Sequence, residues 1–533
     1  MTQSYFEMRD VRPLKGRTWT PLREIIKTPE PTDNEEILSL EEWTGTATAA
    51  IDNSNQATAE ALGWSSGLGM DTHRSGPETF GYSTADAFRD YSEPLGINLV
   101  IDQYIEQEGR TIWHVHTDLI VALKLVREED RWFCPEEGWI EVIRLQRDEN
   151  SNPCLVEMKT EFLRDYLAAR NMGLYCSSYH ERIMVSRQKP ALGLAEDSFK
   201  EENDRDIREG IITGARYPHP TGYFWTRGAL WRTEWIEAGT LSTRVRGDAD
   251  QHATTFAVTN DGERLSASSL SEAMTWVYFK PSVVIALLRH RGAKLHWHSQ
   301  ETGSLGATSF GVHFGINDLG LITVYAKDIG GLATWEQRIW SAHNITPEGG
   351  VSKELFAAQM EVNPSATSAP ESELSDSITQ LNSAFLAKCG HPLLRDHSDV
   401  PVLMGRAHRF VAAKEDGLLE LSKELTKLFI ERINVDAITS MLTLKKGQKS
   451  IGSLKALEKL VALQLTDTEA ASILSPLFGI YDLRLADTHL GSSKIPSGMR
   501  RAGVDISDPA AMQGRELLKS FVRTLNEIAR SLA

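Results

Sequence analysis

The sequence predicts a multidomain protein in which two N-terminal α+β units are followed by an all-α helical bundle. A chain of 533 residues is too long for a single hydrophobic core. Its first two thirds hold short runs of β-branched and aromatic residues between turn residues, whereas its last third repeats apolar residues at three- and four-residue intervals. All 13 tryptophans lie at or before Trp340, and a segment of linker composition, "VNPSATSAPESELSD", follows.

The first α+β unit is predicted over residues 1–190. "RTIWHVHTDLIVAL", "WIEVIRLQRD" and "PCLVEMKT" are short apolar runs typical of strands, and "EFLRDYLAARNMG" is a helix that ends at glycine. The charged stretch "EDSFKEENDRDIREG" follows, and we interpret residues 191–215 as a solvated linker.

The second α+β unit is predicted over residues 216–360 and is richer in strands. Its strand candidates are "GYFWTRGALWRTEWIEAG", "ATTFAVTNDGERLSA" and "FGVHFGINDLGLITVYAKDIGG". "NDG" at Asn260–Gly262 is a turn sequence that hairpins use. A linker over residues 361–375 is predicted to separate this unit from the helical part.

The all-α domain is predicted over residues 376–533. Ser375 is expected to cap a helix that ends at Gly390. "GLLELSKELTKLFIERI" has the spacing of a helix with one buried face. Thr466 and Glu469 form a capping box, and Pro476 is expected at the first position of the next helix. "SDPAAMQGRELLKSFVRTLNEIARSLA" predicts a long terminal helix.

The charge distribution limits where a polyanion can bind. The net charge is −16, which argues against a chain that coats nucleic acid along its whole length. Residues 1–370 hold 36 Lys and Arg against 53 Asp and Glu, while residues 371–533 hold 21 against 20. The C-terminal third is therefore the part that a polyanion can approach.

The remaining bulk features predict a cytoplasmic protein without a membrane partner. No stretch reaches the ~18 consecutive apolar residues of a membrane-spanning helix, and the start of the chain lacks the pattern of a secretory signal. The four cysteines, Cys134, Cys154, Cys176 and Cys389, are far apart and form no CxxC pair, which favours free thiols in a reducing compartment.

A possible catalytic pair lies in "YDLRLADTHLGSS", Tyr481–Ser493. Arg484 and His489 are separated by four residues near a predicted helix end, since "GSS" follows directly. On an ideal helix they lie about 140° apart around the axis. They converge only if the helix frays at His489 or if two copies pack together. The alternative is an ordinary surface, with Arg484 paired to Asp482 or Asp487 and His489 at a helix C-terminus.

An Arg followed after a short spacer by a His, near a helix end in a C-terminal helical bundle, resembles the motif of HEPN-superfamily ribonucleases. The resemblance covers about residues 376–533 and implies a HEPN-like bundle. It implies metal-independent RNA cleavage, without cofactor, in which Arg484 and His489 are catalytic and the products carry 2′,3′-cyclic phosphate ends. The family pattern has a polar residue after the arginine; Leu485 stands there, and Asp487 is a substitute.

The same resemblance implies partners and a biological setting. RNA is the expected partner, and Lys494, Arg500 and Arg501 follow the motif as candidate phosphate contacts. Family members build the site across a symmetric dimer, so a homodimer or higher homo-oligomer is expected. Bacterial anti-phage defence, or abortive infection, is the implied setting. The N-terminal region would then sense a protein or phage-derived trigger, or restrain the nuclease.

Two alternatives stay open. Glu157 and Lys159 in "PCLVEMKT" resemble the E-x-K half of a restriction-endonuclease-like site, with Asp118 or Glu141 as the further carboxylate. That reading predicts a Mg²⁺-dependent DNA nuclease. The other alternative is a non-enzymatic subunit of a nucleic-acid-targeting complex.

Two histidine patterns have the ligand types of a metal site, but polar strand faces explain them better, and no metal site is predicted. One is "WHVHTD", in which His114, His116 and Asp118 share one face of a strand by the two-residue alternation. The other is "HWH" at 296–298.

Overall fold

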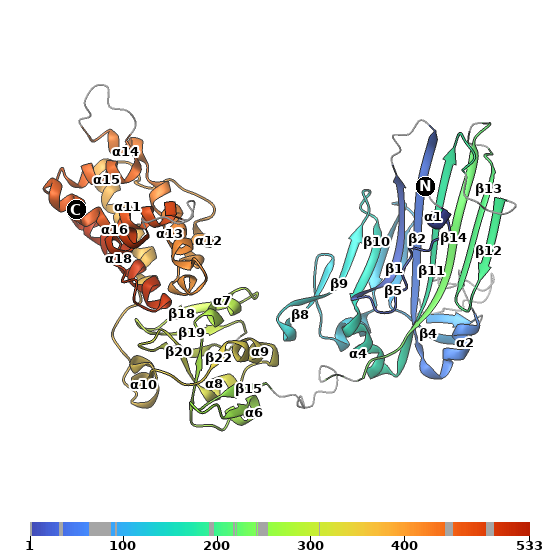
Figure 1. Cartoon of the computed structure of the whole chain (residues 1–533), viewed down its shortest axis with the longest axis horizontal. Helices are drawn as coiled ribbons and strands as arrows, with labels where there is room; N and C mark the ends of the chain where they lie inside the picture. The colour runs from blue at the N-terminus through green and yellow to red at the C-terminus, as the bar shows by residue number, and fades with distance from the viewer. Residues whose placement is uncertain are drawn as a thin grey trace. The chain divides into compact units, whose positions relative to one another are not determined.

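The structure is a computed structural model that describes residues 3–30, 36–62, 87–90, 93–190, 197–216, 219, 221–240, 242, 254–308, 310–442, 451–486 and 495–533. The chain divides into two compact units, Met1–Gln251 and His252–Ala533 (Figure 1). The predicted order of a strand-rich N-terminal region followed by a helical C-terminal region is confirmed. None of the helices in the described ranges combines the length and apolar character needed to cross a membrane.

The first unit is built on one antiparallel sheet, in which the described residues form 12 strands. The order along the sheet is β12-β13-β14-β11-β2-β1-β10-β9-β8-β7, and the β3–β4 hairpin pairs with β2. The bounds are β1 (Trp19–Glu30), β2 (Ile37–Asp52), β3 (Ala87–Asp90), β4 (Glu93–Asn98), β7 (Val126–Glu128), β8 (Arg131–Cys134), β9 (Ile140–Arg147), β10 (Pro153–Lys159), β11 (Met172–Ser186), β12 (Ser198–Glu202), β13 (Asp206–Gly214) and β14 (Phe224–Ile236).

Short elements pack against this sheet. They are α1 (Gln3–Phe6), α2 (Gln56–Ala61), α3 (Thr117–Ala122), α4 (Thr160–Arg170) and the hairpin β5 (Val100–Ile105) to β6 (Arg110–Val115). Helix α4 buries Phe162, Leu163 and Tyr166 in the largest core of the unit, together with Trp132 from β8. It ends at Asn171, which takes the left-handed conformation that a helix C-terminus favours.

The predicted boundaries of the first unit are wrong. Residues 197–214 of the expected charged linker contain β12 and β13, and residues 224–236, expected in the second unit, form β14. Strand β14 pairs with β11 from Leu174↔Ile236 to Ser186↔Phe224. The linker reading failed because β12 lies at the sheet edge, where charged side chains face water; Lys200 and Glu209 pair across β12 and β13.

The second unit begins with a smaller α+β part. Its described sheet has the order β18-β19-β20-β21-β17-β22. The elements are β15 (Thr255–Ala257), β16 (Arg264–Ser266), α6 (Ala267–Leu270), β17 (Trp276–Phe279), α7 (Ser282–Leu288), β18 (Lys294–Trp297), β19 (Thr302–Gly306), β20 (Val312–Ile316), β21 (Ile322–Tyr325), α8 (Ala326–Gly330), α9 (Thr334–His343) and β22 (Asn344–Ile345). The hairpin predicted from "NDG" is confirmed: β15 pairs with β16, and Gly262 has a φ of +89°.

The helical part completes the second unit. Its elements are α10 (Lys353–Met360), α11 (Pro370–Cys389), α12 (Val400–Arg406), η5 (Arg409–Ala413), α13 (Gly417–Leu428), η6 (Ile430–Arg432), α14 (Val435–Thr439), α15 (Ser453–Val461), α16 (Asp467–Ala486), α17 (Ile495–Arg501) and α18 (Ala510–Leu532). The capping box is confirmed, because the Thr466 N–H donates to Glu469 at 3.0 Å and the Glu469 N–H donates to Thr466 Oγ1 at 3.3 Å.

Two predicted helix starts are wrong. Helix α11 begins at Pro370, a residue suited to a first helical position, rather than after Ser375. Pro476 lies inside α16, because the capping box at Thr466 already starts that helix nine residues earlier.

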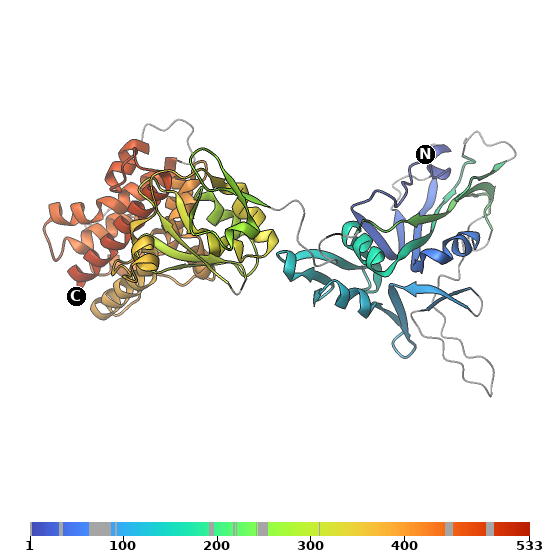
Figure 2. The same cartoon turned by 90° about the horizontal axis from the view of Figure 1, so that it is seen from below.

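The two parts of the second unit share a core, so residues 361–375 do not separate independent domains as predicted. Phe410 and Met512 of the helical part belong to the same apolar cluster as the sheet residues Phe314 and Val324. Figure 2 shows the helices, in orange and red, beside this sheet, in green and yellow. The Phe410 ring stacks on Trp297 with ring centroids 5.6 Å apart.

Candidate functional site

Arg484 lies in the last turn of α16, which ends at Ala486. His489, Asp487 and Lys494 lie outside the described residues. The Arg484 guanidinium forms an ion pair with Glu431 and lies 5.7 Å from the centroid of the Tyr481 ring. Of the two aspartates in the surface alternative, Asp482 lies in the described part of the chain and is not the partner of Arg484 there.

Helix α17 carries the other two predicted RNA contacts and crosses α16 closely. A Cβ on Gly479 would lie 2.5 Å from the Ala502 backbone nitrogen, so the crossing needs glycine there. Arg501 donates a hydrogen bond to Asp482 at 2.7 Å, so the partner of Asp482 is Arg501 rather than Arg484. Arg500 is exposed and has no partner among the described residues.

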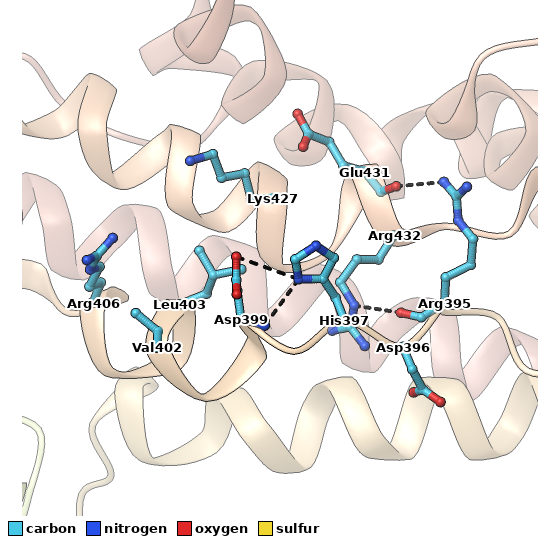
Figure 3. A pocket seen from close by; sticks show the side chains of 10 residues that line it. All are labelled: Arg395, Asp396, His397, Asp399, Val402, Leu403, Arg406, Lys427, Glu431 and Arg432. Carbon is cyan, nitrogen blue, oxygen red and sulfur yellow. Dashed lines mark hydrogen bonds and ion pairs between the residues drawn. The ribbon is translucent and has the colours of Figure 1, made fainter. Parts of the chain in front are cut away.

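A cavity of about 770 Å³ lies in the helical part of the second unit, and Glu431 is one of the residues that line it (Figure 3). Its walls come from the loop before α12, from α12, from the end of α13 and from η6. The lining residues are mostly charged: Arg395, Asp396, His397, Asp399, Val402, Leu403, Arg406, Lys427, Glu431 and Arg432. Glu431 thus belongs both to the cavity wall and to the ion pair with Arg484.

Hydrogen bonds to backbone carbonyls fix the loop before α12 against η6. The Arg395 N–H donates to the Arg432 carbonyl and the Arg432 Nε–H donates back to the Arg395 carbonyl, both at 2.9 Å. Arg395 Nη2 also donates to the Glu431 carbonyl at 2.9 Å. Burial lowers the pKa of Arg432, and the Asp396 carboxylate opposes that shift. Arginine stays charged under these conditions, so this wall carries two oriented cations.

His397 is oriented by the same loop. Its Nδ1 accepts a hydrogen bond from the Asp399 N–H at 3.1 Å, and the Asp399 carboxylate lies 3.8 Å from that nitrogen. A neutral imidazole that accepts at Nδ1 carries its proton at Nε2. The Nε2–H is therefore a donor, and Figure 3 shows that nitrogen pointing away from Asp399. The side chain is 57% exposed, so a ligand can reach it.

Two cations in the cavity are uncommitted. Within the described part of the chain, Arg406 and Lys427 have no ion-pair partner, whereas the Glu431 carboxylate is held by Arg484. The cavity therefore offers a lysine, an arginine and an imidazole N–H to a ligand. This combination suits an anion with several oxygens, such as a phosphodiester.

The sequence did not point to this cavity. "LRDHSD" is a dense group of charged residues before a helix, which was the only available signal. The cavity exists because the chain around Leu394 pairs with Ile433, which brings segments some 40 residues apart together. That pairing is a tertiary event without a local sequence pattern.

The residues of the alternative nuclease site are committed to other partners. Arg144 binds Glu157 at 2.5 Å, and its guanidinium lies 4.2 Å from the Trp19 ring centroid. Lys159 Nζ lies 5.9 Å from the same ring. Asp118 accepts from the Tyr166 hydroxyl at 2.8 Å and pairs with Arg170 on α4. Glu141, the other acidic candidate, pairs with Arg131.

The histidine patterns also resolve into local roles. His116 is not on a strand face, because β6 ends at Val115 and the His116 side chain caps α3 by accepting from the Asp118 N–H. His114 bonds Gln103. His298 Nε2 lies 3.1 Å from the Nε2 of His313 on a neighbouring part of the small sheet. The described residues contain no group of three or more His, Cys, Asp or Glu arranged to hold a metal ion.

No protein-family model, curated protein or solved structure matches this chain.

Proposed function

We propose that the helical part of the second unit is a metal-independent endoribonuclease, in which Arg484 and His489 carry the reaction. The observation that supports this proposal most is the position of Arg484. It stands in the last turn of α16, two residues before the helix ends, and is held by a carboxylate from the wall of a cationic cavity. A cation at that place can meet a phosphate that enters from the cavity side.

The proposed reaction follows from the residue types. RNA carries its own nucleophile, the 2′-hydroxyl beside each phosphate. His489 removes the 2′-hydroxyl proton, because an imidazole titrates near neutral pH. The 2′-oxygen attacks the phosphorus and the bond between phosphorus and the 5′-oxygen breaks. The 5′-oxygen takes a proton from water, the protonated His489 returns its proton to water, and Arg484 stabilises the charge that builds on the phosphoryl oxygens. The products are a 2′,3′-cyclic phosphate and a 5′-hydroxyl, and the proposed role of Asp487 is to supply the polar group that the family pattern has after the arginine.

The assembly and setting of the enzyme belong to the same proposal. A homodimer would bring two copies of the pair together, and the first unit would sense or restrain, since unregulated RNA cleavage harms the cell that makes it. Bacterial anti-phage defence is the setting that the HEPN resemblance implies.

The test is cleavage of labelled RNA and DNA by the full chain, with and without EDTA, followed by analysis of the product ends. We expect RNA cleavage that EDTA does not affect. His489→Ala should lower the rate by about 10²–10⁴-fold, and Arg484→Ala by about 10²–10³-fold. Lys459→Ala, an exposed residue on α15, is the control and should cleave normally. Normal cleavage by both motif variants, or DNA cleavage that EDTA abolishes, would contradict the proposal.

A further inference from the structure

Beyond the cleavage step, we propose that the cavity beside Arg484 binds the phosphodiester backbone of single-stranded RNA next to the bond that is cut. Arg406 and Lys427 are the proposed phosphate contacts, and the His397 Nε2–H is a third donor. This inference rests on the proposed function for its orientation relative to the scissile bond, but the binding itself is measured separately.

The first argument is the supply of donors. In the described ranges, Arg406 and Lys427 have no carboxylate partner, so a ligand phosphate does not have to displace one. The Asp399 N–H fixes the His397 ring before any ligand arrives, which lowers the ordering cost of binding. These donors come from three separate segments, α12, α13 and the loop before α12, and they surround one space rather than one helix face.

The second argument is the link to Arg484. Glu431 lines the cavity and its carboxylate holds the Arg484 guanidinium. A strand whose phosphate sits at Arg484 therefore has its next phosphates within reach of the cavity. Arg500, exposed and without a partner in the described part of the chain, is a further cation on α17, the helix that packs against α16.

The third argument is the chemistry of the lining. Arg406 is exposed, and its planar guanidinium can donate two hydrogen bonds to the oxygens of one phosphate. Lys427 is half-buried and carries its charge on a single ammonium group. Val402, 52% exposed, offers an apolar contact among these charges. Asp396 and Asp399 also line the space and disfavour any anion near them, so the choice of RNA over a carboxylate-rich peptide rests on the ribose and base, which can use the apolar contact and which the peptide lacks. A cavity of about 770 Å³ can hold a ligand of nucleotide size.

The test is RNA binding in the His489→Ala background, so that cleavage does not consume the probe. Fluorescence anisotropy with a labelled single-stranded RNA of roughly 12 nucleotides gives Kd over a series of salt concentrations. We expect Arg406→Ala with Lys427→Ala to weaken binding at least tenfold. The slope of log K against log salt should become shallower by about 1.4, because each lost phosphate contact on a single strand contributes about 0.7. His397→Gln should weaken binding by a smaller factor.

The control removes the same charge elsewhere. Lys459→Ala with Arg530→Ala takes one lysine and one arginine from exposed positions on α15 and α18. Binding that is unchanged in the cavity variant, or that falls equally in the control, would overturn the inference. Equal binding of a poly-glutamate peptide to the cavity would overturn it as well. If the parent protein binds RNA through Arg406 and Lys427 but never cleaves it, the proposed function falls while the binding assignment stands.

Discussion

Replacing Glu371 by glutamine tests how the small sheet and the helical part of the second unit are held together. The Arg409 side chain is 0% exposed and that of Glu371 is 6% exposed. Arg409 donates to Glu371 through Nε at 2.8 Å and Nη2 at 2.6 Å, and through Nη1 to the Gln300 carbonyl at 2.8 Å. Its guanidinium also lies 4.1 Å from the Trp297 ring centroid. One arginine thus connects η5, α11 and the turn after β18.

The magnitude follows from what the substitution leaves behind. Glutamine keeps the shape of Glu371 but not its charge, so the Arg409 cation stays buried without a counterion. Removing one partner of a buried pair typically costs about 3–5 kcal/mol of folding free energy. We expect Glu371→Gln to lower the free energy of unfolding by about 3 kcal/mol, near the lower end of this range, because the amide oxygen still accepts one hydrogen bond.

The assay is urea unfolding of the full chain, with hydrogen exchange along α11 and β18 to assign the transition to the second unit. Glu373→Gln on the same helix is the control; Glu373 is exposed, and its replacement should leave the unfolding midpoint unchanged. The double variant Glu371→Leu with Arg409→Met removes both charges and should recover most of the loss. A loss below about 1 kcal/mol in Glu371→Gln, or a double variant no better than the single, would refute this reasoning.

Three further predictions concern the same unit. Burial lowers the pKa of His408 to about 4, so the folded protein does not bind a proton that the unfolded chain binds below about pH 6.5. The free energy of unfolding is therefore unaffected by this group above that pH and should fall by on the order of 3 kcal/mol on acidification to about pH 4. His408→Gln should remove this part of the pH dependence in urea titrations followed by hydrogen exchange on η5, and a loss of equal size in the variant would contradict the prediction. Glu431→Gln removes the carboxylate that pairs with Arg484, so the guanidinium is free for a phosphate, and kcat/KM for RNA cleavage should rise a few-fold. A lower kcat/KM would mean that the carboxylate is needed to position Arg484. Gly479→Ala would place a Cβ 2.7 Å from the Gly498 carbonyl oxygen and should destabilise the second unit by about 1–3 kcal/mol in thermal unfolding. Gly405→Ala on α12, where the added Cβ meets open space, is the control and should be neutral or slightly stabilising. Equal effects of the two substitutions would show that α16 and α17 do not cross closely at Gly479.

The elements that the sequence predicted well are those whose causes are local. The capping box at Thr466 and the hairpin at Gly262 each depend on a few neighbouring residues and the backbone conformations they favour. Helix α13 also follows from spacing, because Leu421, Leu425 and Leu428 recur on one buried face.

The boundaries failed where the deciding contacts are distant. Strand β14 looks like the start of a new unit after a charged stretch, but 13 residue pairs with β11 place it in the first sheet. The charged stretch itself contains β12 and β13, which pair with each other and carry the cross-strand ion pair between Lys200 and Glu209. A polar edge strand and a solvated linker have the same composition, so pairing alone distinguishes them.

Glu431 lines the cavity and also pairs with Arg484, the residue that the sequence predicts to be catalytic. The kind of ion pair that they form explains how the Arg484 guanidinium can be held in place and still be available to a phosphate. The backbone carbonyl of Glu431 accepts from Arg395, and its carboxylate holds Arg484, so one residue ties the cavity loop to α16. The two side chains of that ion pair are 40% and 32% exposed. Ion pairs in contact with water contribute at most about 1 kcal/mol, because solvent screens both charges. A phosphate that offers two oxygens to the guanidinium can replace such a partner at small cost, whereas a buried pair like Glu371 and Arg409 would resist any ligand.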